Sequence, residues 1–495
     1  MEKLKKLIGV CALVGAGLFA GCDNDSGKKT SVSSNKPPVI KSISAQTVEE
    51  GKSFSIDLGS YVSDPENDPF TLSQISGPGN ITNNVYTYQD QKDNDKNNNV
   101  HVVKFEARDS KGAKSSRSFS LVQNDTYYRI NPSFLNEKMN WICYAPTNFN
   151  PNVQKYPSED SIRKDLELLV DTNFKGIIIY GSNNVLGTKV PQIAKELGLK
   201  VIMGIWDLDN AEEWNNALAA KGCVSAYCLG NEGLHNLRYT LEKLNSKAEQ
   251  LRRATDKPVT TAEIIEEYAK AELIDLGDWV FPNVHPYWHN IKDPAQAAQW
   301  TIQQYVNLKS KTDKIVLIKE AGMPSAGDTG LSEANQNKYF RNLEDLASAY
   351  PTTVFAYFEA FDQPWKNWAP VEPFWGIFKQ DRTRKEASKP QVLFVYIPPI
   401  NTYSDLMGRA VNVKPQDCRI ATYIKVGTTW WIKPYWGTLT SISSNCTWQT
   451  DITTGGIDQT ATQVFAAIVT PDYQPDGHIL PVIGPKVWAI NTATR

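Results

Sequence analysis

The feature that most constrains the fold is a repeated alternation between residues 125 and 390, in which apolar runs of strand length are followed by helical patterns. The helical stretches carry start signals, such as Ser158 before one helix and Asp293-Pro294 before another. Eight strand–helix units in about 250 residues match a (β/α)8 TIM barrel. We therefore predict such a barrel for residues 125–390, with strands at 139–145, 176–181, 200–206, 224–232, 258–265, 279–288, 314–322 and 352–362.

Two stretches that read as β-structure flank this barrel. Residues 39–124 contain short alternating strands separated by turn clusters, which predicts a β-sandwich. Residues 391–495 also favour strands, apart from a helical signal over 458–468. Their aromatic run at 429–436 fits a hydrophobic core and fits a sugar-stacking platform, and we favour the core. The predicted fold class is multidomain: a TIM barrel between an N-terminal β-sandwich and a C-terminal mostly-β accessory domain.

The first 38 residues look like an export signal and a tether. Three lysines precede an apolar run over residues 7–20, which is shorter than a membrane span. The following Gly21-Cys22 resembles a bacterial lipobox, which implies a signal peptide over 1–21 and an acylated Cys22. The alternative is ordinary signal cleavage with Cys22 incidental. Polar residues 23–38 then form a flexible linker, so we expect an exported lipoprotein anchored to the membrane.

Charge and cysteine content narrow the possibilities further. The net charge is −2, with 52 basic and 54 acidic residues, so no basic surplus favours a nucleic-acid partner. Export makes disulfides possible. We predict a bond between Cys418 and Cys446, because both fall in one small domain. Five cysteines follow Cys22, so at least one thiol stays free unless an intermolecular bond forms.

Two glutamates stand at the ends of predicted barrel strands. Glu232 closes the fourth strand and Glu320 closes the seventh, 320 − 232 = 88 residues later. A barrel brings the carboxyl ends of its strands to one rim. Cleaving a glycosidic bond requires a proton donor and a second carboxylate, which are about 5–5.5 Å apart in retaining enzymes. A lone strand-end Glu is usually a salt-bridge partner, but a pair on one rim favours catalysis. Asn231 can add a hydrogen bond to a sugar hydroxyl.

Several motifs in order along residues 135–385 resemble glycoside hydrolase family 17, the β-1,3-glucanase family. LGNE over 229–232 resembles its VGNE motif, and IKEAGMPSAG over 318–327 resembles its SETGWPSAG motif. NVHPYW over 283–288 and FEAFDQPWK over 358–366 also match, as do Glu372 and the WGIF stretch at 375–378. Tyr144 and Tyr180 match tyrosines of the first two strands.

This resemblance implies a retaining hydrolase of β-1,3-glucan or mixed-linkage β-glucan, with Glu232 as acid/base and Glu320 as nucleophile. Tyr287 would hydrogen-bond the nucleophile or the sugar, while Glu359, Lys366 and Glu372 would bind hydroxyls or tune the acid. Alternatively, Lys366 and Glu372 form a surface ion pair. The implied substrate-binding residues are Tyr144, Tyr180, Asn231, His285, Tyr287, Glu359, Trp365, Lys366 and Glu372. No metal or organic cofactor is expected, and we expect a monomer.

Departures from the family pattern leave rival interpretations open. Ile178 stands where the family has an arginine that orients the carboxylates, and Ala321 and Met323 replace Thr and Trp of the nucleophile motif. The same site fits a transglycosylase. A non-catalytic glucan-binding surface lipoprotein is the rival from another class.

The N-terminal domain resembles bacterial cadherin-like and immunoglobulin-like repeats in its segments 62–69 and 107–112. That resemblance offers Ca²⁺ ligands at Glu50, Asp64, Asp68 and Asp109, since Ca²⁺ requires several oxygens. The alternative is a solvated turn, and no metal is predicted.

Overall fold

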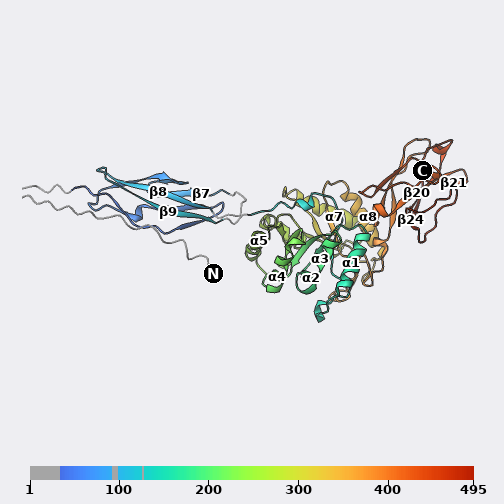
Figure 1. Cartoon of the computed structure of the whole chain (residues 1–495), viewed down its shortest axis with the longest axis horizontal. Coiled ribbons are helices and arrows are strands. Elements are labelled where there is room, and N and C mark those ends of the chain that lie inside the picture. The colour runs from blue at the N-terminus through green and yellow to red at the C-terminus, as the bar shows by residue number, and fades with distance from the viewer. Residues whose placement is uncertain (1–33, 92–98, 125–127) are drawn as a thin grey trace, which may run out of the picture. The chain divides into compact units, whose positions relative to one another are not determined.

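The computed structural model describes residues 34–91, 99–124 and 128–495, which fall into two compact units (Figure 1). The predicted signal peptide and the lipidation site Cys22 lie outside these residues. Among the helices that the structure describes, none has the length and apolar character needed to cross a bilayer.

The N-terminal unit is built from two main sheets. Strands β2, β9, β8 and β5 form one sheet in that order, and β3, β7 and β6 form the other, while β1 pairs with β4. Val103, Phe105 and Ala107 alternate with more exposed residues along β8 and are fully buried, which is the period-2 pattern of a strand with one core face. The predicted sandwich is confirmed. Its strands are β1 (Val39–Ile40), β2 (Gln46–Glu49), β3 (Ser53–Asp57), β4 (Val62–Ser63), β5 (Phe70–Ser76), β6 (Asn80–Thr82), β7 (Val85–Gln89), β8 (Val100–Asp109) and β9 (Lys114–Asn124).

The four candidate calcium ligands of this unit do not converge. The Glu50 backbone N–H donates a hydrogen bond to the carbonyl of Asn124 at the end of β9, whereas Asp109 lies just before the start of that strand. Carboxylate atoms of Asp64, Glu66 and Asp68 lie within 4.8 Å of one another, and Lys111 pairs with Asp68 at 3.0 Å. The interpretation of all four residues as ligands of one calcium ion is therefore wrong, because Glu50 and Asp109 lie at opposite ends of β9.

The second unit begins with the predicted barrel. Its parallel strands run in the order β14-β13-β12-β11-β10-β17-β16-β15, and a parallel bridge between Ile264 and Asn283 joins the two ends of this sheet. The barrel prediction is confirmed, although the regular strands are shorter than the apolar runs. They are β10 (Trp141–Cys143), β11 (Gly176–Ile179), β12 (Lys200–Ile205), β13 (Ala226–Leu229), β14 (Val259–Thr260), β15 (Asn283–Val284), β16 (Ile318–Ala321) and β17 (Phe355–Tyr357).

Helices cover the outside of the barrel (Figure 1). The side chains of β11 show the division: Ile177 and Ile179 join the core shared with the helices, and Ile178 joins a separate core of strand residues. Ser158 and Asp293 cap their helices as predicted, each accepting backbone N–H groups. The helices are α1 (Glu159–Asp171), α2 (Asn184–Thr188), α3 (Val190–Glu196), α4 (Ala211–Ala219), α5 (Leu241–Thr255), α6 (Ala271–Leu276), α7 (Pro294–Lys309) and α8 (Glu333–Ala347).

The C-terminal part of this unit is a second pair of sheets. One has the order β18-β19-β22 and the other β21-β20-β23-β24. One apolar core contains Leu406 of the first sheet and Ile420 of the second, and another contains Tyr423 and Phe465. The strands are β18 (Gln391–Tyr396), β19 (Leu406–Val411), β20 (Arg419–Val426), β21 (Thr429–Lys433), β22 (Thr447–Thr450), β23 (Gln463–Val469) and β24 (Val487–Thr494).

Two predictions for this part are wrong. The helical signal at 458–468 gives a short 3-10 turn at Asp458–Thr460 followed by β23, an interior strand whose side chains are buried on both faces. Burial on both faces removes the period-2 alternation that would have indicated a strand. The predicted disulfide does not form either. Cys418 donates to the Lys414 carbonyl, and the Cys446 sulfur accepts a hydrogen bond from Asn173 of the barrel.

Candidate active site

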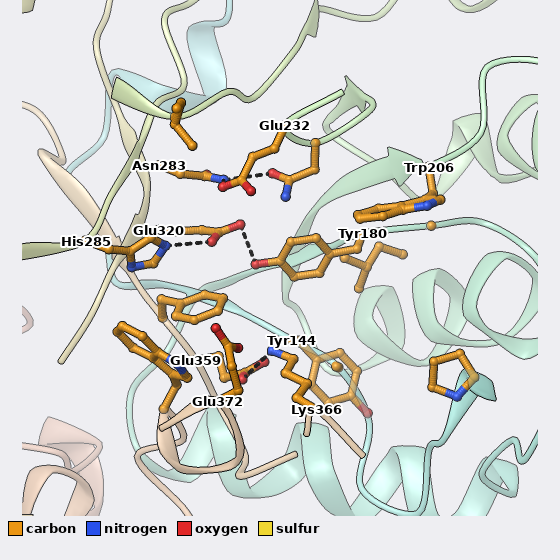
Figure 2. Close-up of a pocket in the computed structure, with 18 of the residues that line it drawn as sticks. Tyr144, Tyr180, Trp206, Glu232, Asn283, His285, Glu320, Glu359, Lys366 and Glu372 are labelled. Atoms are coloured by element: carbon orange, nitrogen blue, oxygen red, sulfur yellow. Dashed lines mark hydrogen bonds and ion pairs between the residues drawn. The ribbon is translucent and has the colours of Figure 1, made fainter. Parts of the chain in front are cut away.

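A cavity of about 1050 Å³ lies at the carboxyl ends of the barrel strands. Glu232 follows β13 and Glu320 lies in β16, and both line this cavity. Figure 2 shows their carboxylates facing the same space from neighbouring walls. The topology therefore brings together two acidic groups that are far apart in sequence, as the strand-end argument predicts.

A chain of hydrogen bonds connects the two carboxylates. The Asn283 amide nitrogen donates to Glu232 Oε1 at 2.7 Å and to Asn231 Oδ1 at 3.0 Å. Lys319 Nζ donates to the same Asn231 oxygen at 2.6 Å and to Glu320 Oε1 at 3.0 Å. Both contacts use the Oδ1 atom of Asn231, so the amide nitrogen Nδ2 of Asn231 remains available to donate to a sugar hydroxyl.

Lys319 supplies the positive charge of this network. Its side chain is 1% exposed, and its ammonium lies 4.0 Å from the centre of the Tyr180 ring. Neighbours in a regular strand point to opposite faces, yet Lys319 and Glu320 contact each other where the pairing of β16 with β17 shifts register. The lysine thus stands beside the nucleophile candidate, whereas Ile178 of β11 packs in the core of strand residues.

Two further groups hold Glu320 in its charged form. Tyr180 donates to Oε1 at 2.8 Å, and His285 Nε2 lies 3.0 Å from Oε2. An ionised carboxylate only accepts, so Nε2 must carry the hydrogen of that contact. Burial alone would raise the pKa of Glu320, but the Lys319 ammonium and the His285 hydrogen bond hold it well below its usual range. Glu320 is therefore an anion at neutral pH, as a nucleophile must be.

A second ion pair lies beside the first. Lys366 Nζ contacts Glu359 Oε1 at 2.6 Å, and both groups are buried. Burial raises the pKa of Glu359 to about 7, although the lysine opposes the shift. Its other oxygen, Oε2, is buried without a hydrogen-bond partner among the described residues, and Glu359 lines the cavity. Burial also raises the pKa of the neighbouring Glu372. A sugar hydroxyl would satisfy the unpaired Glu359 oxygen.

The backbone around Glu232 is held in an uncommon conformation. Glu232 has φ of 55°, in the left-handed region that non-glycine residues seldom adopt. The loop after it is fixed by buried Glu263, which accepts the N–H groups of Leu234 and His235. Arg238 donates to the Asn231 carbonyl. A strained residue that its surroundings hold so firmly is typical of a functional site.

Comparison with known proteins agrees with this geometry. Residues 142–376 match the BtgE/BtgC glycoside hydrolase domain, and residues 35–122 match a bacterial Ig domain. A probable glucan endo-1,3-beta-glucosidase from Aspergillus clavatus is 26% identical over 320 residues, covering 54% of this chain and 44% of the fungal protein. A probable family 17 glucosidase from Saccharomyces cerevisiae is 26% identical over 247 residues, covering 45% of this chain and 62% of the yeast protein.

The barrel is a family 17 glycoside hydrolase domain. The matched part of this protein spans less than half the length of the Aspergillus relative. A solved family 17 beta-1,3-glucanosyltransferase from Rhizomucor miehei has 21% identity and a TM-score of 0.43, covering 50% of this chain and 96% of that one.

Aromatic side chains line both sides of the family 17 cleft. Trp206 follows β12, and Trp365 and Trp368 follow β17, so they stand on different walls. The Arg238 guanidinium lies 4.3 Å from the Trp206 ring centre, which fixes that indole. Trp288, next to the His285 segment, adds a fourth indole. Flat apolar rings flanking the acidic centre suit the faces of successive sugar units.

The family 17 cleft gathers most of the residues that the sequence singled out. Glu232, Glu320 and eight of the nine predicted substrate-binding residues line it: Tyr144, Tyr180, Asn231, His285, Glu359, Trp365, Lys366 and Glu372. Tyr287 does not: its hydroxyl donates to Asp328 at 2.9 Å, so the predicted contact with the nucleophile is absent and His285 makes it instead. The Tyr144 hydroxyl is also engaged elsewhere, on Asp165. Lys366 pairs with Glu359, so the surface-pair alternative with Glu372 is wrong.

Sequence reasoning missed two members of the network. Lys319 lies in a matched motif, but a regular strand would turn its side chain away from Glu320, so the sequence gives no signal of their pairing. Asn283 stood in a matched segment without a role, and the structure makes it the donor to both Asn231 and Glu232.

Proposed function

We propose that this protein cleaves β-1,3-glucan, or mixed-linkage β-glucan, with retention of configuration, through Glu232 and Glu320. The observation that carries the proposal is the ionised, buried Glu320 joined to Glu232 by a hydrogen-bonded chain. The name of the Aspergillus relative, a probable glucan endo-1,3-beta-glucosidase, supports a glucan substrate. The aromatic walls support a polymer that continues on both sides of the reacting bond.

The mechanism has two displacements. Glu320 attacks the anomeric carbon, while protonated Glu232 gives its proton to the departing glycosidic oxygen. Asn283 occupies Glu232 Oε1, so Oε2 is the oxygen that carries the proton. The sugar is then esterified to Glu320, and Glu232, now ionised, takes a proton from water as the water's oxygen attacks the same carbon. The ester breaks and Glu320 returns as an anion.

A second sugar chain can take the place of water in the second displacement. The site then transfers glucan instead of hydrolysing it, and its residues keep the same roles. The alternative, a non-catalytic glucan-binding protein, requires that neither displacement occurs. The ionised state of Glu320 and its hydrogen-bonded connection to Glu232 favour the catalytic interpretation instead.

Following hydrolysis of a short β-1,3-glucan oligosaccharide by NMR tests the proposal directly. We expect the β-anomer of the new reducing end to appear first and the α-anomer to follow by mutarotation, because two inversions restore the configuration. Products longer than the substrate identify transfer, and only shorter ones identify hydrolysis. First appearance of the α-anomer, or absence of any product on a panel of β-glucans, would overturn the proposal.

We also propose that the protein acts as an exported monomer anchored through acylated Cys22. The support is the lipobox-like sequence around Cys22 and the polar stretch that follows. We expect the wild-type chain, expressed in a bacterium, to enter the detergent phase of a Triton X-114 extract, and Cys22→Ser to move to the aqueous phase. Equal partition of the two proteins would contradict the anchor.

A further inference from the structure

Three aromatic side chains of β21 and of the turn that follows it are exposed to solvent. Trp431 is 46% exposed, Tyr435 is 64% exposed and Trp436 is 68% exposed. We call these three residues the aromatic platform. Apolar rings gathered on a surface mark an interaction site more often than scattered single ones do.

The platform is distinct from the hydrophobic core of this domain. Trp430 and Ile432, which alternate with Trp431 along β21, pack with the core around Tyr423 and Phe465. Trp431 therefore points to the opposite side of its strand. The core interpretation of the sequence holds for Trp430 and is wrong for the platform, which contributes nothing to the clusters of buried residues.

A neighbouring turn fixes the two indoles in place. The His478 ring stands edge-on to Trp431, with ring centres 4.4 Å apart, and lies 6.0 Å from Trp436. His478 Nδ1 lies 2.9 Å from the Trp430 carbonyl, and the Ile432 N–H donates to the Gly477 carbonyl at 3.0 Å. Trp436 lies so close over Gly477 that a Cβ there would stand 1.7 Å from the indole. The rings are thus oriented before any ligand arrives, which lowers the entropy cost of binding.

The chemistry around the rings favours a neutral, hydroxylated ligand. Lys433, the cation nearest to the platform in sequence, is buried and paired with Asp458. The exposed Asp476, two residues from His478, caps the turn with one carboxylate oxygen and offers an acceptor to hydroxyl groups. A carboxylate repels phosphate and acidic peptides, while flat uncharged rings match the apolar faces of sugars.

We propose that the aromatic platform binds a β-glucan chain at a second site, apart from the cleft, and thereby keeps the enzyme on particulate substrate. The choice of glucan rests on the proposed function, because the platform belongs to the same compact unit as the barrel. Stacking on two or three rings gives weak binding at each contact, and the cleft on the same chain multiplies its effect through a high local concentration.

Binding of the full chain to particulate β-1,3-glucan tests this proposal. The parent protein is Glu320→Ala, so that the polymer stays intact, and the test variant adds Trp431→Ala and Trp436→Ala. Loss of two stacked rings should weaken binding at least about tenfold, which is about 1.4 kcal/mol. The matched control adds Tyr403→Ala, which removes an exposed aromatic residue (73%) of the same domain outside the platform and should leave binding unchanged.

The same substitutions in the active protein separate this proposal from the proposed function. Trp431→Ala with Trp436→Ala should slow release of sugar from particulate glucan and leave the cleavage of a short soluble oligosaccharide unchanged. Equal binding of the parent and the doubly substituted protein would overturn the second site, even with hydrolysis intact. An enzyme that cleaves no β-glucan would overturn the proposed function alone, while loss of binding in the test variant would still support the platform.

Discussion

Glu320→Ala should lower kcat/KM on β-1,3-glucan by at least about 10⁴-fold, because it removes the atom that forms the covalent bond to sugar. Three partners hold Glu320 ionised and oriented for attack in the free protein. Its removal therefore abolishes the chemical step, and the loss of activity is larger than a weaker binding of substrate would give. Release of reducing ends from a soluble oligosaccharide measures it. Glu386→Gln, which alters an exposed carboxylate paired with Lys389, serves as a control that should keep full activity.

Azide distinguishes a nucleophile from a merely structural carboxylate. With an activated aryl β-glucoside, azide should restore turnover of Glu320→Ala and give the α-glycosyl azide, because a single displacement inverts the carbon. Glu232→Ala is the matched variant. It keeps the nucleophile, so azide should intercept the covalent intermediate and give the β-glycosyl azide. If the two variants gave the same anomer, the assigned roles of Glu232 and Glu320 would be wrong.

Lys319→Met should lower kcat by about 10²- to 10³-fold, the usual effect of removing one fixed charge from an active site. The ammonium holds Glu320 ionised against the effect of burial, so its removal raises the pKa of Glu320. The protonated form is inactive as a nucleophile. The acidic limb of the kcat/KM profile must therefore move to higher pH, and activity disappears earlier as the pH falls. A pH–rate profile on the soluble oligosaccharide measures the shift.

A charge-conserving variant separates this effect from damage to the fold. Removing one partner of a buried ion pair costs about 3–5 kcal/mol of stability, so thermal unfolding of Lys319→Met must be recorded alongside its activity. Lys319→Arg keeps the positive charge at the Asn231–Glu320 position and should keep the acidic limb near that of the wild type. An unshifted limb in a folded Lys319→Met protein would show that Lys319 does not control the charge of Glu320.

The parts of the site that were predictable from sequence are those that strand topology determines. A glutamate at the end of strand four and another at the end of strand seven must meet on one rim of a barrel, whatever the loops do. Glu232 and Glu320 follow that rule, and so do Asn231 and Glu359. The motifs also placed His285 and Tyr180 near the centre, and the structure gives each a contact with Glu320.

Pairings among side chains were harder to predict, because they depend on rotamers and small shifts of register. Tyr287 and His285 are two residues apart, yet only His285 contacts Glu320, while Tyr287 turns to Asp328. Lys319 would point away from Glu320 in a regular strand, and the irregular pairing of β16 brings them together. No periodicity in the sequence reports such a shift.

The C-terminal domain shows the limit of composition as a guide. Adjacent tryptophans at 430 and 431 look alike in the sequence, but they lie on opposite faces of an edge strand, so one is half-buried and one exposed. Similarly, the segment 458–468 reads as helical because its later apolar residues are continuous, yet these residues lie in β23, an interior strand buried on both faces.

The unbonded cysteines of the described residues have a consequence for chemical reactivity. Only the thiolate reacts with oxidants and disulfides, and burial raises the pKa of Cys228 to about 12 and that of Cys143 further still. Both thiols lie inside the barrel close to the catalytic pair, where an oxidised sulfur would disturb the charge of Lys319 and Glu320. Keeping them protonated and enclosed makes the catalytic centre indifferent to the redox state of its surroundings, so neither an oxidising nor a reducing medium should change its rate.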